Sequence, residues 1–347
     1  MSTTRHLHDI VHVNPDLSSI DGIAGWAVER RPVADSAKVT GVVTLPGRTV
    51  LLAEPAPTGP RGAPSRAIAL DDRLRVVARA NVGRDARNLA ADPTRNRLYV
   101  VNRGPEGAGV SMLDATTLVP LGHRAIDAGL HDVAVDPAAG LVYVSHWIRR
   151  RIIVLRADDL SPVQEIGDAS FTGALGLAVD PDLGHILVAR TFRSGEPNVE
   201  ALSVIRRGPD GQHVVQSTRA LGQGVQPWDV AVDPEAGLVY VLGLGGGGVP
   251  PQLIVLDRGG LGERGRVEVA GTPLAVAAQP GTGIAHVATG LGVQIVDGRR
   301  AEVAALVPGR GTPCVAVGER DRIVAGAVDG EVVRVQAARS LPVVEWR

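Results

Sequence analysis

The chain has 347 residues, of which 44% are hydrophobic, and a net charge of −1. This composition excludes a disordered chain. The chain has 4 Trp, 3 Tyr, 2 Phe and no concentrated basic run, which argues against a nucleic-acid partner. The single cysteine excludes an intramolecular disulfide and a multi-cysteine metal site. The sequence contains neither a signal-like start nor 18 uninterrupted apolar residues, so we expect a cytoplasmic protein without a membrane segment.

Residues 1–36 lack the repeat that fills the rest of the chain, so we interpret them as an N-terminal extension. Within this extension, Gly25 to Val28 reads GWAV, an apolar stretch that is typical of a β-strand.

A repeated unit of strand, turn and second strand fills residues 37–347. Its turns recur every 39 to 53 residues, a spacing typical of one four-stranded blade of a β-propeller. The sequence therefore predicts an all-β, seven-bladed propeller with four antiparallel strands per blade. The seven copies are GVVTLPGRTVLLAE from Gly41, NLAADPTRNRLYVVN from Asn88, DVAVDPAAGLVYVSH from Asp132, GLAVDPDLGHILVAR from Gly176, DVAVDPEAGLVYVLG from Asp229, AVAAQPGTGIAHVAT from Ala275 and CVAVGERDRIVAGAV from Cys314.

The residue types within each unit agree with this architecture. The first strand carries alanine at its centre in six copies, which suits strands that crowd around a propeller axis. Asp-Pro with a nearby glycine, as in Asp136, Pro137 and Gly140, favours a tight turn, and we interpret the aspartates at this point of each repeat as turn formers. The second strand, such as Leu141 to Val144, is apolar on both faces, as a sheet between two neighbouring sheets requires.

Closure of the ring has more than one solution. The strand at Gly25 to Val28 could complete the last blade, or the extension could plug one mouth of the ring. Alternatively, the last blade holds four strands of its own, ending at Val343 to Trp346, and the ring closes by simple end-to-end packing.

The run GLVYV after Asp-Pro, together with later strands such as VSMLD at residues 110–114, resembles the YVTN-type and NHL-type repeat propellers over roughly residues 37 to 346. Such propellers include structural scaffolds, sugar lactonases of the six-phosphogluconolactonase kind and the streptogramin lyase. The resemblance implies the fold. The catalytic motifs of those enzymes are not recognisable here, so it assigns no catalytic residue.

Ligand sites in propellers form where the loops into the innermost strands meet the loops that leave the second strands, around one mouth of the channel. In blades 2 to 5 these loops carry Arg, Asn, His, Trp and Asp, whereas blades 6 and 7 contribute small or apolar residues. This one-sided polar funnel favours a ligand pocket over a plain scaffold.

The catalytic candidates are His131, His146 and Glu54. Both histidines belong to the third blade, where an imidazole that titrates near neutral pH would act as a general acid or base, or bind a metal. Alternatively, each histidine caps a strand or bonds a loop carbonyl. Glu54 starts a proline-rich loop and is either an acid/base group or a solvated side chain.

Eight further side chains are substrate-binding candidates. Arginines suit a carboxylate or phosphate, asparagines orient a carbonyl or water, and aromatic rings form an apolar wall; surface, turn or rim packing is the alternative for each. Asp132 and Asp229 stand at the same point before VAVDP, where binding a ligand and satisfying turn amides both remain open. The set is Arg87, Asn88, Asn102, Trp147, Arg190, Phe192, Trp228 and Asp229.

From these features we expect an enzyme that acts on a small molecule by acid/base chemistry, as a hydrolase, lyase or isomerase. No motif for a redox or phosphate-bearing cofactor is present, although a divalent metal in the central channel stays open. The composition, rich in Ala, Arg, Gly and Val, is typical of a high-GC bacterium and suits specialised metabolism. The alternative is a non-catalytic propeller that binds a protein or peptide.

Overall fold

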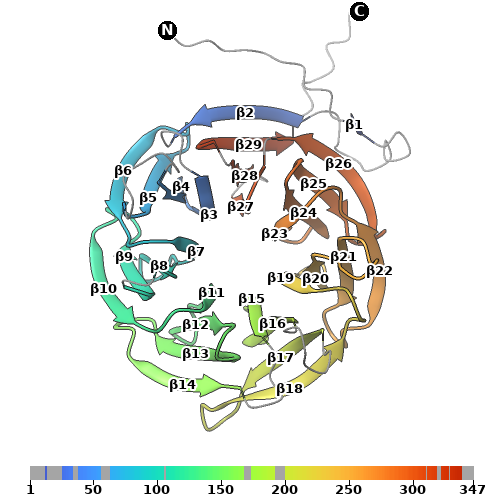
Figure 1. Cartoon of the computed structure of the whole chain (residues 1–347), viewed down its shortest axis with the longest axis horizontal. Coiled ribbons are helices and arrows are strands. Elements are labelled where there is room, and N and C mark those ends of the chain that lie inside the picture. The colour runs from blue at the N-terminus through green and yellow to red at the C-terminus, as the bar shows by residue number, and fades with distance from the viewer. Residues whose placement is uncertain are drawn as a thin grey trace, which may run out of the picture.

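The computed structural model describes residues 12–13, 26–33, 38–55, 63–104, 107–167, 173–191, 200–309, 311–318, 322–327 and 329–337. Every regular element in these ranges is a β-strand, and the strands form seven antiparallel sheets arranged as the blades of a ring (Figure 1). The expected all-β, seven-bladed propeller is therefore confirmed.

The first four blades each use four consecutive strands. Blade 1 consists of β3 (Lys38–Leu45), β4 (Arg48–Glu54), β5 (Arg66–Asp71) and β6 (Val76–Asn81). Blade 2 consists of β7 (Ala86–Asp92), β8 (Arg97–Asn102), β9 (Gly109–Asp114) and β10 (Pro120–Ala125). Blade 3 consists of β11 (Leu130–Asp136), β12 (Leu141–His146), β13 (Arg151–Arg156) and β14 (Pro162–Ile166). Blade 4 consists of β15 (Gly173–Asp180), β16 (His185–Thr191), β17 (Ala201–Arg207) and β18 (His213–Ala220).

The last three blades complete the ring. Blade 5 consists of β19 (Pro227–Asp233), β20 (Leu238–Gly243), β21 (Gln252–Asp257) and β22 (Glu263–Glu268). Blade 6 consists of β23 (Pro273–Gln279), β24 (Ile284–Thr289), β25 (Gly292–Asp297) and β26 (Glu302–Pro308), extended by the short β1 (His12–Val13). Blade 7 combines β27 (Cys314–Gly318), β28 (Arg322–Gly326) and β29 (Glu331–Ala337) with β2 (Trp26–Pro32).

Ring closure joins the two ends of the described chain. Strand β2 pairs antiparallel with β29 along its whole length and forms the outermost strand of blade 7 (Figure 1). Val33 continues this contact, since its N–H donates to Gly330 O at 3.0 Å and its side chain is buried in the core between blades 7 and 1. The alternative fourth strand at Val343 to Trp346 falls outside the described residues.

The core lies between neighbouring blades. Every side chain of β12 is buried, and its tyrosine, like the tyrosines at the same point of β8 and β20, is fully buried against the next blade. The outermost strand β10 is exposed along its whole length. Because burying a large apolar side chain stabilises a fold by about 1.5–3 kcal/mol, the apolar second strands that mark the repeat are what hold the ring together.

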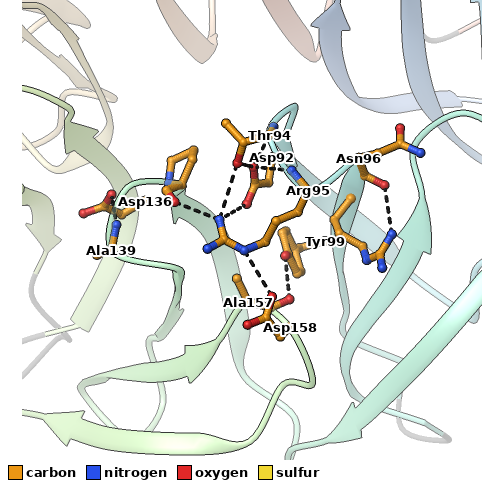
Figure 2. A network of polar contacts seen from close by, with 11 residues as sticks. Asp92, Thr94, Arg95, Asn96, Tyr99, Asp136, Ala139, Ala157 and Asp158 are labelled. Carbon is orange, nitrogen blue, oxygen red and sulfur yellow. Dashed lines mark hydrogen bonds and ion pairs between the residues drawn. The ribbon is translucent and has the colours of Figure 1, made fainter.

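Turn aspartates connect the blades on the face of the ring opposite the second-strand ends. Asp92 Oδ1 accepts the N–H of Thr94 at 2.9 Å and that of Arg95 at 3.1 Å. The Arg95 guanidinium then spans to blade 3, where it donates to Pro137 O at 2.7 Å and to Asp158 at 3.1 Å (Figure 2). Asp136, Asp180 and Asp233 make the same kind of turn bond, so the interpretation of these aspartates as turn formers is confirmed, and Asp180 and Asp233 also bind groups of the next blade.

Candidate functional site

A cavity of about 410 Å³ lies at the mouth of the ring where the second strands of blades 2 to 5 end. Half of its wall comes from residues at or just after the ends of β8, β12, β16 and β20, and the other half from residues at or just before the beginnings of β11, β15 and β19. Four consecutive blades therefore contribute to one space. The lining residues are Arg103, His131, Trp147, Leu175, Thr191, Gln226, Trp228 and Leu244.

Strand alternation decides which side chains reach this cavity. Asn102 and His146 are the last residues of β8 and β12, and their side chains are only 1% and 0% exposed. Successive side chains of a strand point to opposite faces, so it is the following residues, Arg103 and Trp147, that form the wall. In blade 4 the same rule buries Arg190 and places Thr191 on the cavity.

His131 and Trp228 form an edge-to-face pair on the wall. Their ring centroids are 4.8 Å apart at an interplanar angle of 88°, and Trp228 Nε1 donates to Leu274 O at 3.0 Å, which fixes the indole. Burial, together with the charges of Arg103 and Arg87, lowers the pKa of His131 to about 3. The imidazole is therefore neutral near pH 7, and it can position or polarise a ligand there only as a neutral group.

His146 lies apart from the cavity and supports the loop after β12. Its Nδ1 accepts the N–H of Arg149 at 3.3 Å, and its Nε2 is 3.9 Å from Asp127 Oδ1. Burial lowers the pKa of His146, against the opposing influence of Asp127. His146 thus bonds a loop N–H, not the loop carbonyl that the sequence analysis named as its structural alternative, and the two histidines do not share the cavity wall.

Four charged side chains, here called the rim cluster, border the cavity at Arg103: Glu54, Asp85, Arg87 and Arg103. Asp85 lies 3.0 Å from Arg87 Nε and 3.9 Å from Arg103 Nε, and Glu54 lies 3.8 Å from Arg87 Nε. Burial raises the pKa of Glu54 despite the nearby Arg87, while burial and Arg87 lower the pKa of Arg103. The structure thus brings Glu54 and Arg87 together beside the cavity, although neither forms its wall.

Asp132 and Asp229 tie inner strands of neighbouring blades together. Each carboxylate accepts the N–H of the residue that follows it, at 2.8 Å. The second oxygen of Asp132 accepts the N–H of Leu177 at 2.8 Å, and that of Asp229 accepts the N–H of Val276 at 2.9 Å. Burial raises the pKa of both carboxyl groups, and the charge of Asp229 adds to the effect on Asp132.

The other substrate-binding candidates have partners within the protein. Arg190 Nη1 donates to Ser203 Oγ at 2.9 Å, and Asn102 Nδ2 donates to Ser111 Oγ at 2.7 Å. Asn88 Nδ2 donates to His131 O at 3.4 Å. Phe192 lies outside the described residues.

The sequence reasoning missed five wall residues: Arg103, Leu175, Thr191, Gln226 and Leu244. Two of them, Arg103 and Thr191, directly follow the candidates Asn102 and Arg190 in the sequence. The period-2 alternation of the second strands is the signal that distinguishes them from their buried neighbours.

Over the residues that the structure describes, no group of three or more His, Cys, Asp and Glu side chains is placed to hold a metal ion. Within the same residues, no helix has the length and apolar character needed to cross a membrane.

Fold and cavity together define a seven-bladed β-propeller with a pocket at one mouth. No known family profile matches the chain, and no curated protein matches its sequence. Among solved structures, it is similar to Kuenenia stuttgartiensis hydrazine synthase, with a TM-score of 0.73 at 15% identity over 88% of this chain and 97% of that one.

Two further solved structures resemble the chain to a similar degree. U3-55K gives a TM-score of 0.65 at 13% identity, over 89% of this chain and 98% of that one. The WD40 β-propeller domain of Doa1 gives 0.67 at 13% identity, over 91% and 99%. At these identities the similarity shows the propeller fold alone.

Proposed function

We propose that this chain is an enzyme that binds a small organic molecule in the cavity of blades 2 to 5 and converts it by acid/base chemistry, as a hydrolase, lyase or isomerase. The observation that carries the proposal is the cavity. Small-molecule sites measure about 300–1,000 Å³ and combine mostly apolar walls with a few polar groups. This cavity, at about 410 Å³, combines Trp147, Leu175, Trp228 and Leu244 with polar side chains such as Arg103.

Acid/base chemistry near neutral pH is favoured by a carboxyl group that keeps its proton to an unusually high pH. Glu54 in the rim cluster and Asp132, directly after His131, both have raised pKa values because they are buried. We assign Glu54 as the acid/base candidate beside the cavity and His131 as a neutral positioning group on its wall. His146 is not part of this proposal, because its side chain supports a loop.

The test is to incubate the full chain with a bacterial small-molecule extract and to follow its components by mass spectrometry. Leu244→Trp should fill the cavity and abolish conversion. Val119→Trp is the matched control, because Val119 is 54% exposed beside the turn before β10, at the end of blade 2 that lies away from the cavity. Conversion by the wild type and Val119→Trp but not by Leu244→Trp supports the proposal.

The opposite outcomes are equally clear. Conversion that survives in Leu244→Trp would place the chemistry elsewhere. Absence of any bound or converted molecule would refute the enzyme and favour the non-catalytic scaffold.

A further inference from the structure

The walls of the cavity differ strongly in character. Trp147, Leu175, Trp228 and Leu244 give apolar surface, and Trp228 is held by its contact with His131 and its bond to Leu274 O. Such fixed aromatic surface favours a ligand with a flat apolar body.

Among the wall residues of this cavity, Arg103 alone carries a full charge, since His131 is neutral near pH 7. Over the described residues, its guanidinium makes no side-chain hydrogen bond, and its acidic neighbour Asp85 lies 3.9 Å away. Asp85 sits closer to Arg87, at 3.0 Å, so it compensates Arg103 only in part. The Arg103 side chain is 33% exposed, so its donors remain within reach of a ligand.

The charge around Arg103 favours an anion. The rim cluster contains two guanidinium groups against two carboxylates, and both carboxylates pair more closely with Arg87, at 3.0 Å for Asp85 and 3.8 Å for Glu54, which leaves Arg103 with Asp85 at 3.9 Å. Burial and the repulsion of Arg87 lower the pKa of Arg103, against the opposing influence of Asp85 and Glu54. A planar guanidinium pairs bidentately with a carboxylate, and such charge-assisted bonds are about twice as strong as neutral ones.

We propose, building on the proposed function of this cavity, that its ligand is a planar apolar carboxylate whose acid group binds Arg103 and whose body lies against Trp147 and Trp228. A carboxylate fits better than a phosphate ester, because a phosphate monoester carries about −1.5 to −2 charges near pH 7, whereas the wall offers the single charge of Arg103 and its other polar residues, Thr191 and Gln226, are uncharged. The rest of the wall excludes water from the body of the ligand.

The experiment is isothermal titration of the full chain with 1-naphthylacetate, 1-naphthylacetamide and 1-naphthyl phosphate, which share one aromatic body. We expect the acetate to bind at least ten-fold more tightly than the amide and more tightly than the phosphate. Arg103→Gln should abolish the advantage of the acetate. Arg149→Gln, which removes the same charge from a rim residue of blade 3 that pairs with Asp127, should preserve it.

The outcomes separate this inference from the proposed function. Equal affinity for acetate and amide, unchanged in Arg103→Gln, would refute the carboxylate while leaving a small-molecule cavity. Preference for the phosphate would replace the carboxylate with a different anion and likewise overturn the inference. Binding by none of the three probes would overturn it too. Failure of the proposed function itself shows instead as conversion unaffected by Leu244→Trp, or as no conversion at all.

Discussion

The carboxyl group of Asp229 is buried on an inner strand of the ring, where its ionised form is unfavourable. Burial raises the pKa of Asp229. The folded chain therefore loses stability as pH rises through the raised value, because the carboxyl group must then ionise while it is buried. Asp229→Asn loses a hydrogen bond to the N–H of Val276 or of the next residue at every pH, but it also removes the ionisable group. We therefore expect the substitution to cost about 1 kcal/mol less at pH 8 than at pH 5, measured by urea unfolding.

Asp257→Asn is the control for this comparison. Asp257 is the last residue of β21, its side chain is 42% exposed, and its bond from Arg264 lowers its pKa. Its ionisation is therefore complete well below pH 5, and the cost of the substitution should be the same at both pH values. A cost of Asp229→Asn that is equal at pH 5 and pH 8 would show that the carboxyl group titrates normally.

His286 makes the fold sensitive to acid. It is fully buried in blade 6, its Nε2 lies 3.0 Å from Gln279 Oε1, and burial lowers its pKa to about 3. An unfolded histidine takes up its proton near pH 6.5, so acid stabilises the unfolded chain and folding stability falls as pH drops from about 6.5 toward 3.

His286→Leu should therefore lower the free energy of unfolding by less at acid pH than at neutral pH. Between pH 7.5 and pH 5, its cost in urea unfolding should shrink by about 2 kcal/mol. Only the wild type is destabilised over this range, because only its unfolded state gains a proton at position 286. A cost that does not change between these pH values would mean that the folded protein admits the proton at His286.

At the residue scale, the sequence located the loops at the mouth of the ring, but several of its candidate side chains lie outside the cavity wall. Repeat alignment identifies the pairs Asn102-Arg103 and Arg190-Thr191, yet a shift of one residue exchanges the buried face for the exposed one. Asn102 and Arg190 are candidates from the sequence because an amide and a guanidinium suit ligand binding, but both residues are buried. His131 does lie on the cavity wall, but it does not titrate near neutral pH as the sequence analysis expected, because burial and the charges of Arg103 and Arg87 from another blade lower its pKa.

At the scale of elements, the turns act as links between sheets. The guanidinium of Arg258 in blade 5 donates to both oxygens of Asp180 in blade 4, at 2.5 and 2.6 Å, and Asp180 is only 2% exposed. Removing one partner of a buried ion pair leaves an uncompensated charge, which typically costs about 3–5 kcal/mol.

Arg258→Gln should accordingly lower the free energy of unfolding by roughly 3 kcal/mol. Arg264→Gln is its match in the same blade, since Arg264 pairs with Asp257 at 2.7 Å on the surface and such pairs contribute at most about 1 kcal/mol. Chemical denaturation of both variants measures the difference. Equal and small effects would show that Asp180 is compensated by its turn amides alone.

At the scale of the whole molecule, the fold was predictable because its signal is repeated. Asp-Pro turns and doubly apolar second strands recur in the sequence, and each copy reinforces the others. Ring closure was not predictable in the same way. It depends on one unrepeated strand, β2, whose partner β29 lies about 300 residues further along the chain.

This closure gives the last prediction, which concerns deletion of residues 1–33. Without β2, strand β29 loses its outer partner at all seven paired positions, together with the ion pair between Glu29 and Arg334 and the buried side chain of Val33. The bare edge of β29 is also a template for association. We expect the melting temperature to fall by roughly 10 °C or more and oligomers to form, as followed by calorimetry and size-exclusion chromatography.

Deletion of residues 1–24 keeps β2 intact and is the control, which should melt within a few degrees of the full chain. A synthetic peptide of residues 24–34, added to the longer deletion, should restore most of the lost stability because strand pairing needs no covalent link. If the longer deletion melts like the control and stays monomeric, β2 covers blade 7 without closing the ring. The last sheet would then be stable with the strands β27 to β29 alone.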